Sequence, residues 1–207
     1  MILAAKLRTP TSRRDLVPRT ALVEHAAAGT VERLTLVAAP AGWGKTTLLA
    51  AWQRHERGAR RFAWLSVDPW DNDPVRFWTY AVEAIRTVEP LVGADALALL
   101  HARGTRVVEN VLPALVNDLE PLGERFVLVL DDYHLIENEE IHEALVFLLD
   151  HLPRSLHLVI STRFDPPLPI ARMRGSFDLA ERITRPKRAS MRRRPSQSST
   201  PSTAKTT

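Results

Sequence analysis

The apolar residues of this chain fall into short continuous runs, separated by stretches in which they recur every three or four positions. Short continuous apolar runs are typical of strands buried on both faces, and the longer spacing is typical of helices. Strands are predicted at 34–38, 61–67, 126–130 and 156–161, with a fifth indicated near 177–183. Helices are predicted at 46–54, 74–87, 106–119 and 139–152. This alternation predicts a three-layer α/β fold with a mainly parallel sheet of four to five strands.

Composition excludes several classes of function. The chain has 207 residues, 45% of them hydrophobic, which is enough for a sizeable core. It has no cysteine, which excludes disulfides, thiolate metal sites and cysteine nucleophiles. No apolar run approaches the roughly 18 residues of a membrane-spanning helix, and the N-terminus does not have the pattern of a secretory signal. A cytoplasmic protein without a membrane partner is therefore expected.

The net charge of +4 is unevenly distributed. Residues 182–207 hold eight of the 28 basic residues and none of the 24 acidic ones, so residues 1–181 carry a net charge of −4. The basic segment is also rich in Ser, Thr and Pro, and it is predicted to be a disordered tail. We therefore expect a leader at 1–30 that contributes to a ligand site, a main domain at 31–181 and a tail at 182–207.

A phosphate-binding loop is indicated between the first strand and its helix. The pattern GxxxxGK[ST] is matched except at its first position, which is alanine. Two glycines let backbone N–H groups turn inward, the lysine brings a cation to the terminal phosphates, and the threonine hydroxyl completes a Mg²⁺ shell. Alanine at the first position is tolerated where its φ stays negative. The predicted loop residues are Ala39, Pro40, Ala41, Gly42, Trp43, Gly44, Lys45, Thr46 and Thr47.

Charged residues follow two of the other predicted strands. Asp131 and Asp132 end the strand at 126–130, and Arg163 follows the strand at 156–161. In phosphate-loop ATPases a strand-end aspartate supports Mg²⁺, and a second acid polarises the attacking water. Asp131 is predicted for the first role, with Thr46 as the other metal-binding residue, and Asp132 for the second. Lys45 and Arg163 are predicted to act on the terminal phosphate.

These motifs together resemble the nucleotide-binding domain of MalT-type, large LuxR-family transcriptional activators, which belong to the STAND class of signalling ATPases. The resemblance covers about residues 3–175, and an alanine at the start of the phosphate loop is typical of that family. Its motifs in this sequence are Leu16-Val17-Pro18-Arg19, the loop at 39–47, Trp64-Leu65-Ser66-Val67-Asp68, Asp71-Asn72-Asp73-Pro74-Val75-Arg76-Phe77, Val129-Leu130-Asp131-Asp132-Tyr133-His134 and Ser161-Thr162-Arg163.

The resemblance implies a switch that binds ATP or ADP with Mg²⁺. Such proteins self-associate in the ATP form, activate transcription and hydrolyse ATP slowly as a reset. The resemblance also implies that Val17, Pro18 and Arg19 lie against the adenine. Association with homologous regulators is a further expectation.

The sequence departs from the family after about Ser176, where no winged-helix, sensor or helix-turn-helix domain follows. A truncated or frame-shifted gene product is expected, without sequence-specific DNA binding. Whether the site turns over ATP stays open at this point. One alternative is a non-enzymatic interaction module, or a gene remnant, that keeps the fold. A second is a non-specific nucleic-acid binder that acts through the basic tail.

Overall fold

The computed structural model describes residues 2–11, 20–28, 33–56, 58–175 and 179–183. These residues form a five-stranded sheet in the order β2-β3-β4-β1-β5, in which every neighbouring pair is parallel. The predicted α/β class and parallel sheet are confirmed, and the fifth strand is present. The strands are β1 (Leu34–Ala38), β2 (Arg61–Ser66), β3 (Phe126–Asp131), β4 (Leu156–Thr162) and β5 (Leu179–Ile183).

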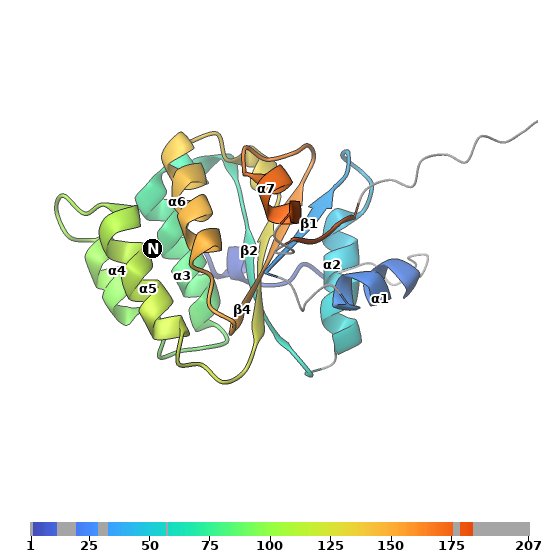
Figure 1. Ribbon diagram of the computed structural model, residues 1–207, viewed down its shortest axis with the longest axis horizontal. Coiled ribbons are helices and arrows are strands. Elements are labelled where there is room, and N and C mark those ends of the chain that lie inside the picture. The colour runs from blue at the N-terminus through green and yellow to red at the C-terminus, as the bar shows by residue number, and fades with distance from the viewer. Residues whose placement is uncertain (1, 12–19, 29–32, 57, 176–178, 184–207) are drawn as a thin grey trace, which may run out of the picture.

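Helices cover both faces of the sheet (Figure 1). Helices α1 and α2 pack on one face, and α3 to α6 pack on the other, each over its own hydrophobic cluster. No helix within the described ranges is both long enough and apolar enough to cross a membrane. The helices are α1 (Thr20–Ala28), α2 (Lys45–Glu56), α3 (Pro74–Arg86), α4 (Ala94–Leu100), α5 (Leu112–Leu119), α6 (Glu139–Asp150) and α7 (Ile170–Gly175), with shorter turns η1 (Ala4–Leu7), η3 (Pro69–Asn72), η4 (Val107–Val111) and η5 (Tyr133–Leu135).

Three of the helices, α1, α4 and α7, were not predicted from the pattern of apolar residues. Helix α1 lies in the segment expected to be a leader, and α4 has apolar residues at six of its seven positions, so it shows no polar face. The helix predicted at 106–119 begins with the π-helical turn η4 and continues as α5. Pro113 lies at this junction and has no N–H to donate to the preceding turn, which interrupts a regular α-helix.

The two hydrophobic clusters are built around aromatic side chains. Trp52 and Trp64 are buried between the sheet and the α1–α2 layer, and Phe77 and Trp78 are buried under the α3–α6 layer. Trp70 differs, because 79% of it is exposed on the short turn η3.

The strand order decides which loops meet. Strand β4 lies between β1 and β3, and Ala38 pairs with Thr162 while Leu130 pairs with Ile160. The carboxyl ends of the three strands are therefore nearly level. In open parallel sheets ligands bind at this edge. The segments that follow β1, β3 and β4 thus converge. Ala39 and Thr162, for example, are 123 positions apart in the sequence and are joined by a backbone hydrogen bond.

The N-terminal segment is held beside β2 by an ion-pair cluster. The Lys6 ammonium lies 3.0 Å from an Asp68 oxygen, pairs with Asp71, and sits 4.3 Å from the centre of the Tyr80 ring. Asp71 is fully buried and also accepts a 3.1 Å hydrogen bond from Arg76. Asp68 and Asp71 form the capping box of η3.

Lys6→Ala is expected to lower the free energy of unfolding by about 2 kcal/mol, because it removes a charged hydrogen-bond donor from a buried carboxylate. A urea titration measures this change. Arg106→Ala is the control, since it breaks the exposed pair with Glu109 and should cost less than about 1 kcal/mol. Equal losses for the two variants would contradict the buried role of Lys6.

Candidate nucleotide site

The loop after β1 has the backbone that a phosphate cradle needs. Gly42 and Gly44 have φ values of 77° and 74°, which glycine adopts without steric cost. The Leu48 N–H donates to the Gly44 carbonyl over 2.9 Å, so the first turn of α2 forms directly behind the loop. Lys45 donates from Nζ to the Ala39 carbonyl over 2.9 Å and closes the loop on itself.

Ala39 does not need the conformational freedom of glycine. Asp132 is the only non-glycine residue with a positive φ in the described part of the chain, so Ala39 avoids the left-handed region. Its N–H donates to the Thr162 carbonyl over 3.1 Å, which continues the pairing of β1 with β4. The first position of the loop therefore still belongs to the sheet, where alanine fits as well as glycine.

Asp131 is the centre of a hydrogen-bond chain that joins three elements. Its Oδ2 accepts from the Thr46 hydroxyl over 2.8 Å, and its Oδ1 accepts from the Ser161 hydroxyl over 2.6 Å. Only 3% of Asp131 is exposed. Burial raises the pKa of Asp131 above its ordinary value, and the hydrogen bonds from Ser161 and Thr46 oppose that shift. The carboxylate is thus held in a place where a nearby cation would stabilise it.

Ser161 was not predicted as a site residue. The sequence offered one signal, a hydroxyl residue at the end of an apolar strand, but such residues are common there. Its importance comes from the sheet order, which places β4 beside β3 and aims the Ser161 hydroxyl at Asp131. Thr162 has a different role, because its hydroxyl donates to the Phe164 carbonyl over 2.6 Å and shapes the loop after β4.

Asp132 begins the turn that follows β3. Its φ of 60° is the left-handed conformation, which costs roughly 1–2 kcal/mol for a residue other than glycine. Its side chain is 43% exposed, and its N–H lies 3.4 Å from the Ser161 hydroxyl oxygen. A strained backbone that presents a carboxylate to solvent beside a phosphate loop is a common feature of functional sites.

His134 lies in the same turn and is almost fully buried, with 4% of its side chain exposed. Neither ring nitrogen has a hydrogen-bond partner within the described residues, and Asp132 Oδ1 is 3.7 Å from Nδ1. Burial lowers the pKa of His134, and the charges of Arg163 and Lys45 lower it further, against the opposing charge of Asp132. The ring is therefore neutral at pH 7, with unsatisfied nitrogens among the charged groups of the site.

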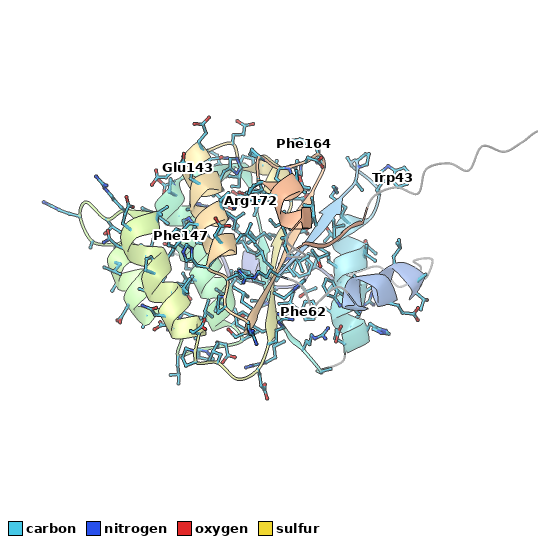
Figure 2. The ribbon with its side chains drawn as sticks, viewed as in Figure 1. Trp43, Phe62, Glu143, Phe147, Phe164 and Arg172 are labelled. Carbon is cyan, nitrogen blue, oxygen red and sulfur yellow. The ribbon has the colours of Figure 1, made fainter. Side chains whose placement is uncertain are left out.

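Two exposed aromatic side chains lie at the rim of the site. Trp43 in the loop is 36% exposed and Phe164 is 59% exposed, and both lie at the same end of the molecule (Figure 2). The Phe164 ring meets the His134 ring edge to face, with 6.0 Å between ring centres. Arg163 is exposed between β4 and this rim.

The structure brings together most of the predicted residues. Lys45, Thr46, Asp131, Asp132 and Arg163 come from the converging ends of three strands. Pro40, Ala41 and Thr47 lie in the loop and the first turn of α2, where the Pro40 carbonyl accepts from the Trp43 N–H over 3.4 Å. Val17, Pro18 and Arg19 lie outside the described residues, so their predicted contact with adenine stays a prediction.

The oxygen donors of the site fit Mg²⁺. Hydroxyl and carboxylate oxygens are the ligands that this hard cation prefers, and it commonly keeps several waters and phosphate oxygens as well. Thr46 and Asp131 place two such oxygens 2.8 Å apart next to the loop. Burial raises the pKa of the Asp131 carboxyl, and a bound cation would lower it again.

Comparison with known proteins places the chain in a family. The family model described as an AAA ATPase domain matches residues 15–161, which include the loop and the ends of β3 and β4. The chain belongs to this family. A chain in the structure of Drosophila ORC bound to DNA is also similar, with 12% identity, 80% of this chain and 93% of that chain covered, and a TM-score of 0.47.

Curated relatives confirm the resemblance to MalT-type regulators. The HTH-type transcriptional regulator MalT of Serratia proteamaculans is 37% identical over 183 residues, which cover 87% of this chain and 20% of that protein. The serine/threonine-protein kinase PknK of Mycobacterium tuberculosis is 34% identical over 179 residues, which cover 86% of this chain and 16% of that protein. The chain thus spans about a fifth of the curated relatives that it matches.

Proposed function

We propose that this chain is an ATP-dependent switch domain that binds ATP or ADP with Mg²⁺ and hydrolyses ATP slowly. The observation that carries the proposal is the hydrogen-bond chain from Thr46 through Asp131 to Ser161, directly beside the glycine-containing loop. This arrangement joins a phosphate cradle to a metal-binding carboxylate. Neither group alone would distinguish a nucleotide site from an ordinary strand-to-helix turn.

Different residues of the site are proposed to bind the phosphates and the Mg²⁺ ion. Backbone N–H groups of the loop and the start of α2 bind the phosphate oxygens, and Lys45 exchanges its bond to the Ala39 carbonyl for one to the terminal phosphates. Thr46 and Asp131 hold the Mg²⁺ ion, which neutralises phosphate charge when bound. Arg163 faces the same phosphate from the end of β4.

Asp132 is the proposed residue for orienting the attacking water. Its carboxylate is partly exposed, and no resolved hydrogen bond of its side chain competes for this role among the described residues. The neutral His134 ring lies beside it, and its two buried nitrogens have no hydrogen-bond partner among the described residues. An aspartate reaches less far than a glutamate, which is consistent with slow turnover.

The similarity to MalT suggests the biological setting. We propose that the domain serves a LuxR-family, STAND-type transcriptional regulator in the cytoplasm, and that its ATP form associates with further copies or with homologous regulators. The support is the 37% identity to a protein named as a transcriptional regulator. The interaction-module alternative keeps the fold without turnover, and the nucleic-acid alternative uses only the basic tail.

A thermal melt with and without Mg-ATP tests nucleotide binding. Ligand at about 100 times its dissociation constant stabilises a protein by about 2.7 kcal/mol, which shifts the melting temperature of a domain of this size by roughly 5–11 °C. Lys45→Ala should abolish that shift, because it removes the cation at the terminal phosphates. Arg106→Ala, an exposed cation on another element, should keep it.

Each outcome separates the candidate functions. A shift that is lost in Lys45→Ala supports the switch, and phosphate release then measures turnover. A cooperative melt without any shift would refute nucleotide binding and favour the interaction module. DNA binding that is unaffected by Lys45→Ala and lost on removal of residues 184–207 would favour the nucleic-acid alternative.

A further inference from the structure

The turn that carries Asp132 and His134 is held by a buried tyrosine–histidine pair. The Tyr133 hydroxyl lies 2.7 Å from Nδ1 of His142, which comes from α6. Tyr133 is 1% exposed and His142 is 8% exposed, so water does not compete for this bond. The two rings also meet edge to face, with 5.5 Å between their centres.

The protonation states of the pair define the direction of the bond. Burial raises the pKa of Tyr133, so its phenol keeps the proton and donates. Burial lowers the pKa of His142, although Glu139 and the Ile136 backbone oppose that shift. The neutral imidazole therefore accepts at Nδ1 from the Tyr133 hydroxyl and carries its own proton on Nε2.

His142 thus holds the turn at two points, the Tyr133 hydroxyl and the Ile136 backbone. A third tie comes from η3, where the Asn72 amide donates to the Leu135 carbonyl over 2.8 Å. These ties fix the residues on both sides of His134. Asp132 has a left-handed backbone in this turn, and the buried pair holds the residue that follows it.

We infer that Tyr133 and His142 form a positioning pair for ATP hydrolysis, which sets the geometry of Asp132 and His134 without contact with the nucleotide. The inference rests on the proposed function. The phosphate loop and the Thr46–Asp131 bond lie on β1, α2 and β3, and among the described residues the side chains of the pair make no hydrogen bond to them. The pair should therefore affect turnover more than nucleotide affinity.

The test separates kcat from nucleotide binding in the full-length chain. Tyr133→Phe removes the donor, and His142→Leu removes the acceptor at similar volume. Each is expected to lower kcat about tenfold, because small displacements of a water-orienting group have effects of this size or larger. The dissociation constant for a non-hydrolysable ATP analogue, measured by calorimetry, should stay within about twofold of the wild type.

Two further variants distinguish positioning from general stability. His142→Asn keeps an acceptor near the position of Nδ1 and is expected to retain kcat within about threefold. Tyr80→Phe is the matched control, since Tyr80 is equally buried and its hydroxyl accepts from the Leu3 N–H over 3.2 Å. It should lower the melting temperature, with an unchanged kcat.

The results that would overturn the inference are distinct from a failure of the proposed function. If the wild type hydrolyses ATP and Tyr133→Phe keeps its kcat, the pair has no positioning role. If kcat and affinity fall together, or if Tyr80→Phe loses as much kcat, the pair acts only through stability. A wild type that binds no nucleotide, or binds it without turnover, refutes the hydrolytic switch, and the positioning role falls with it.

Discussion

Asp131→Asn is expected to abolish ATP hydrolysis while the nucleotide-free protein becomes as stable as the wild type or more stable. The carboxylate is buried, and burial raises its pKa. The buried charge therefore lowers the free energy of unfolding of the nucleotide-free protein. A neutral amide removes that cost. Its oxygen can accept from Ser161 and its nitrogen can donate to the Thr46 oxygen, so both hydrogen bonds have replacements.

The expected loss of activity follows from the proposed metal-binding role of this carboxylate. A metal ion contributes several kcal/mol of transition-state stabilisation, so hydrolysis should fall at least about 100-fold. Stability without nucleotide should rise by up to about 1 kcal/mol, or roughly 2–4 °C. Phosphate release at saturating Mg-ATP and a thermal melt measure the two effects.

Ser161→Ala is the informative comparison for Asp131→Asn. It leaves the carboxylate charged and removes one of its two hydroxyl donors, so stability should fall by about 2 kcal/mol while part of the hydrolysis remains. The two variants are thus expected to change stability in opposite directions. A destabilised Asp131→Asn protein that still hydrolyses ATP would contradict the role given to this residue.

Gly93→Ala is expected to be the most destabilising single-methyl change, by about 3 kcal/mol. Gly93 precedes α4 with a φ of 77°, and an added Cβ would lie 2.4 Å from the Val82 Cγ1 atom in the core. Val82 is fully buried on α3 and has no free space to enter. The left-handed φ costs about 1 kcal/mol, and overpacking adds about 1–3 kcal/mol.

Gly104→Ala is the control that separates the backbone cost of Gly93→Ala from its overpacking cost. Gly104 has a φ of 72°, and nothing lies within 4 Å of its added Cβ, so only the backbone cost of about 1 kcal/mol is expected. The melting temperature should fall by roughly 6–12 °C in Gly93→Ala and by roughly 2–4 °C in Gly104→Ala. Equal shifts would mean that the core at Val82 accommodates the methyl group.

The predicted strands and helices agree with the structure where the apolar residues form a clear continuous run or a clear helical period. The strands at 34–38 and 126–130 and the helix at 74–87 were predicted to within a residue or two, because burial on both faces and a 3.6-residue period leave a direct trace in the sequence. Helix α4 was not predicted, because its nearly uniform apolar composition has no such period. Strand β5 reaches Ile183, two residues past the expected domain boundary.

The candidate site was predictable in its motifs and less so in its contacts. Lys45, Thr46 and Asp131 each belong to a recognisable local pattern, and the structure places them together. The contact of Ser161 with Asp131 and the burial of His134 depend on which strands are neighbours. The pattern of residues along the chain does not reveal the strand order. The same holds for Lys6, whose partners lie 62 and 65 residues away.

The sequence by itself therefore determined the class of fold, the phosphate loop and the acidic strand end, since each follows from residue types within one short segment. Tertiary structure alone decided that Thr46 bonds Asp131 across 85 residues, that Ser161 supports it from β4, and that His142 holds the turn after β3. The physical reason is that the spacing of buried residues and the backbone freedom of glycine are properties of a single short segment. Hydrogen bonds between segments exist only once the strand order brings their ends to the same edge of the sheet.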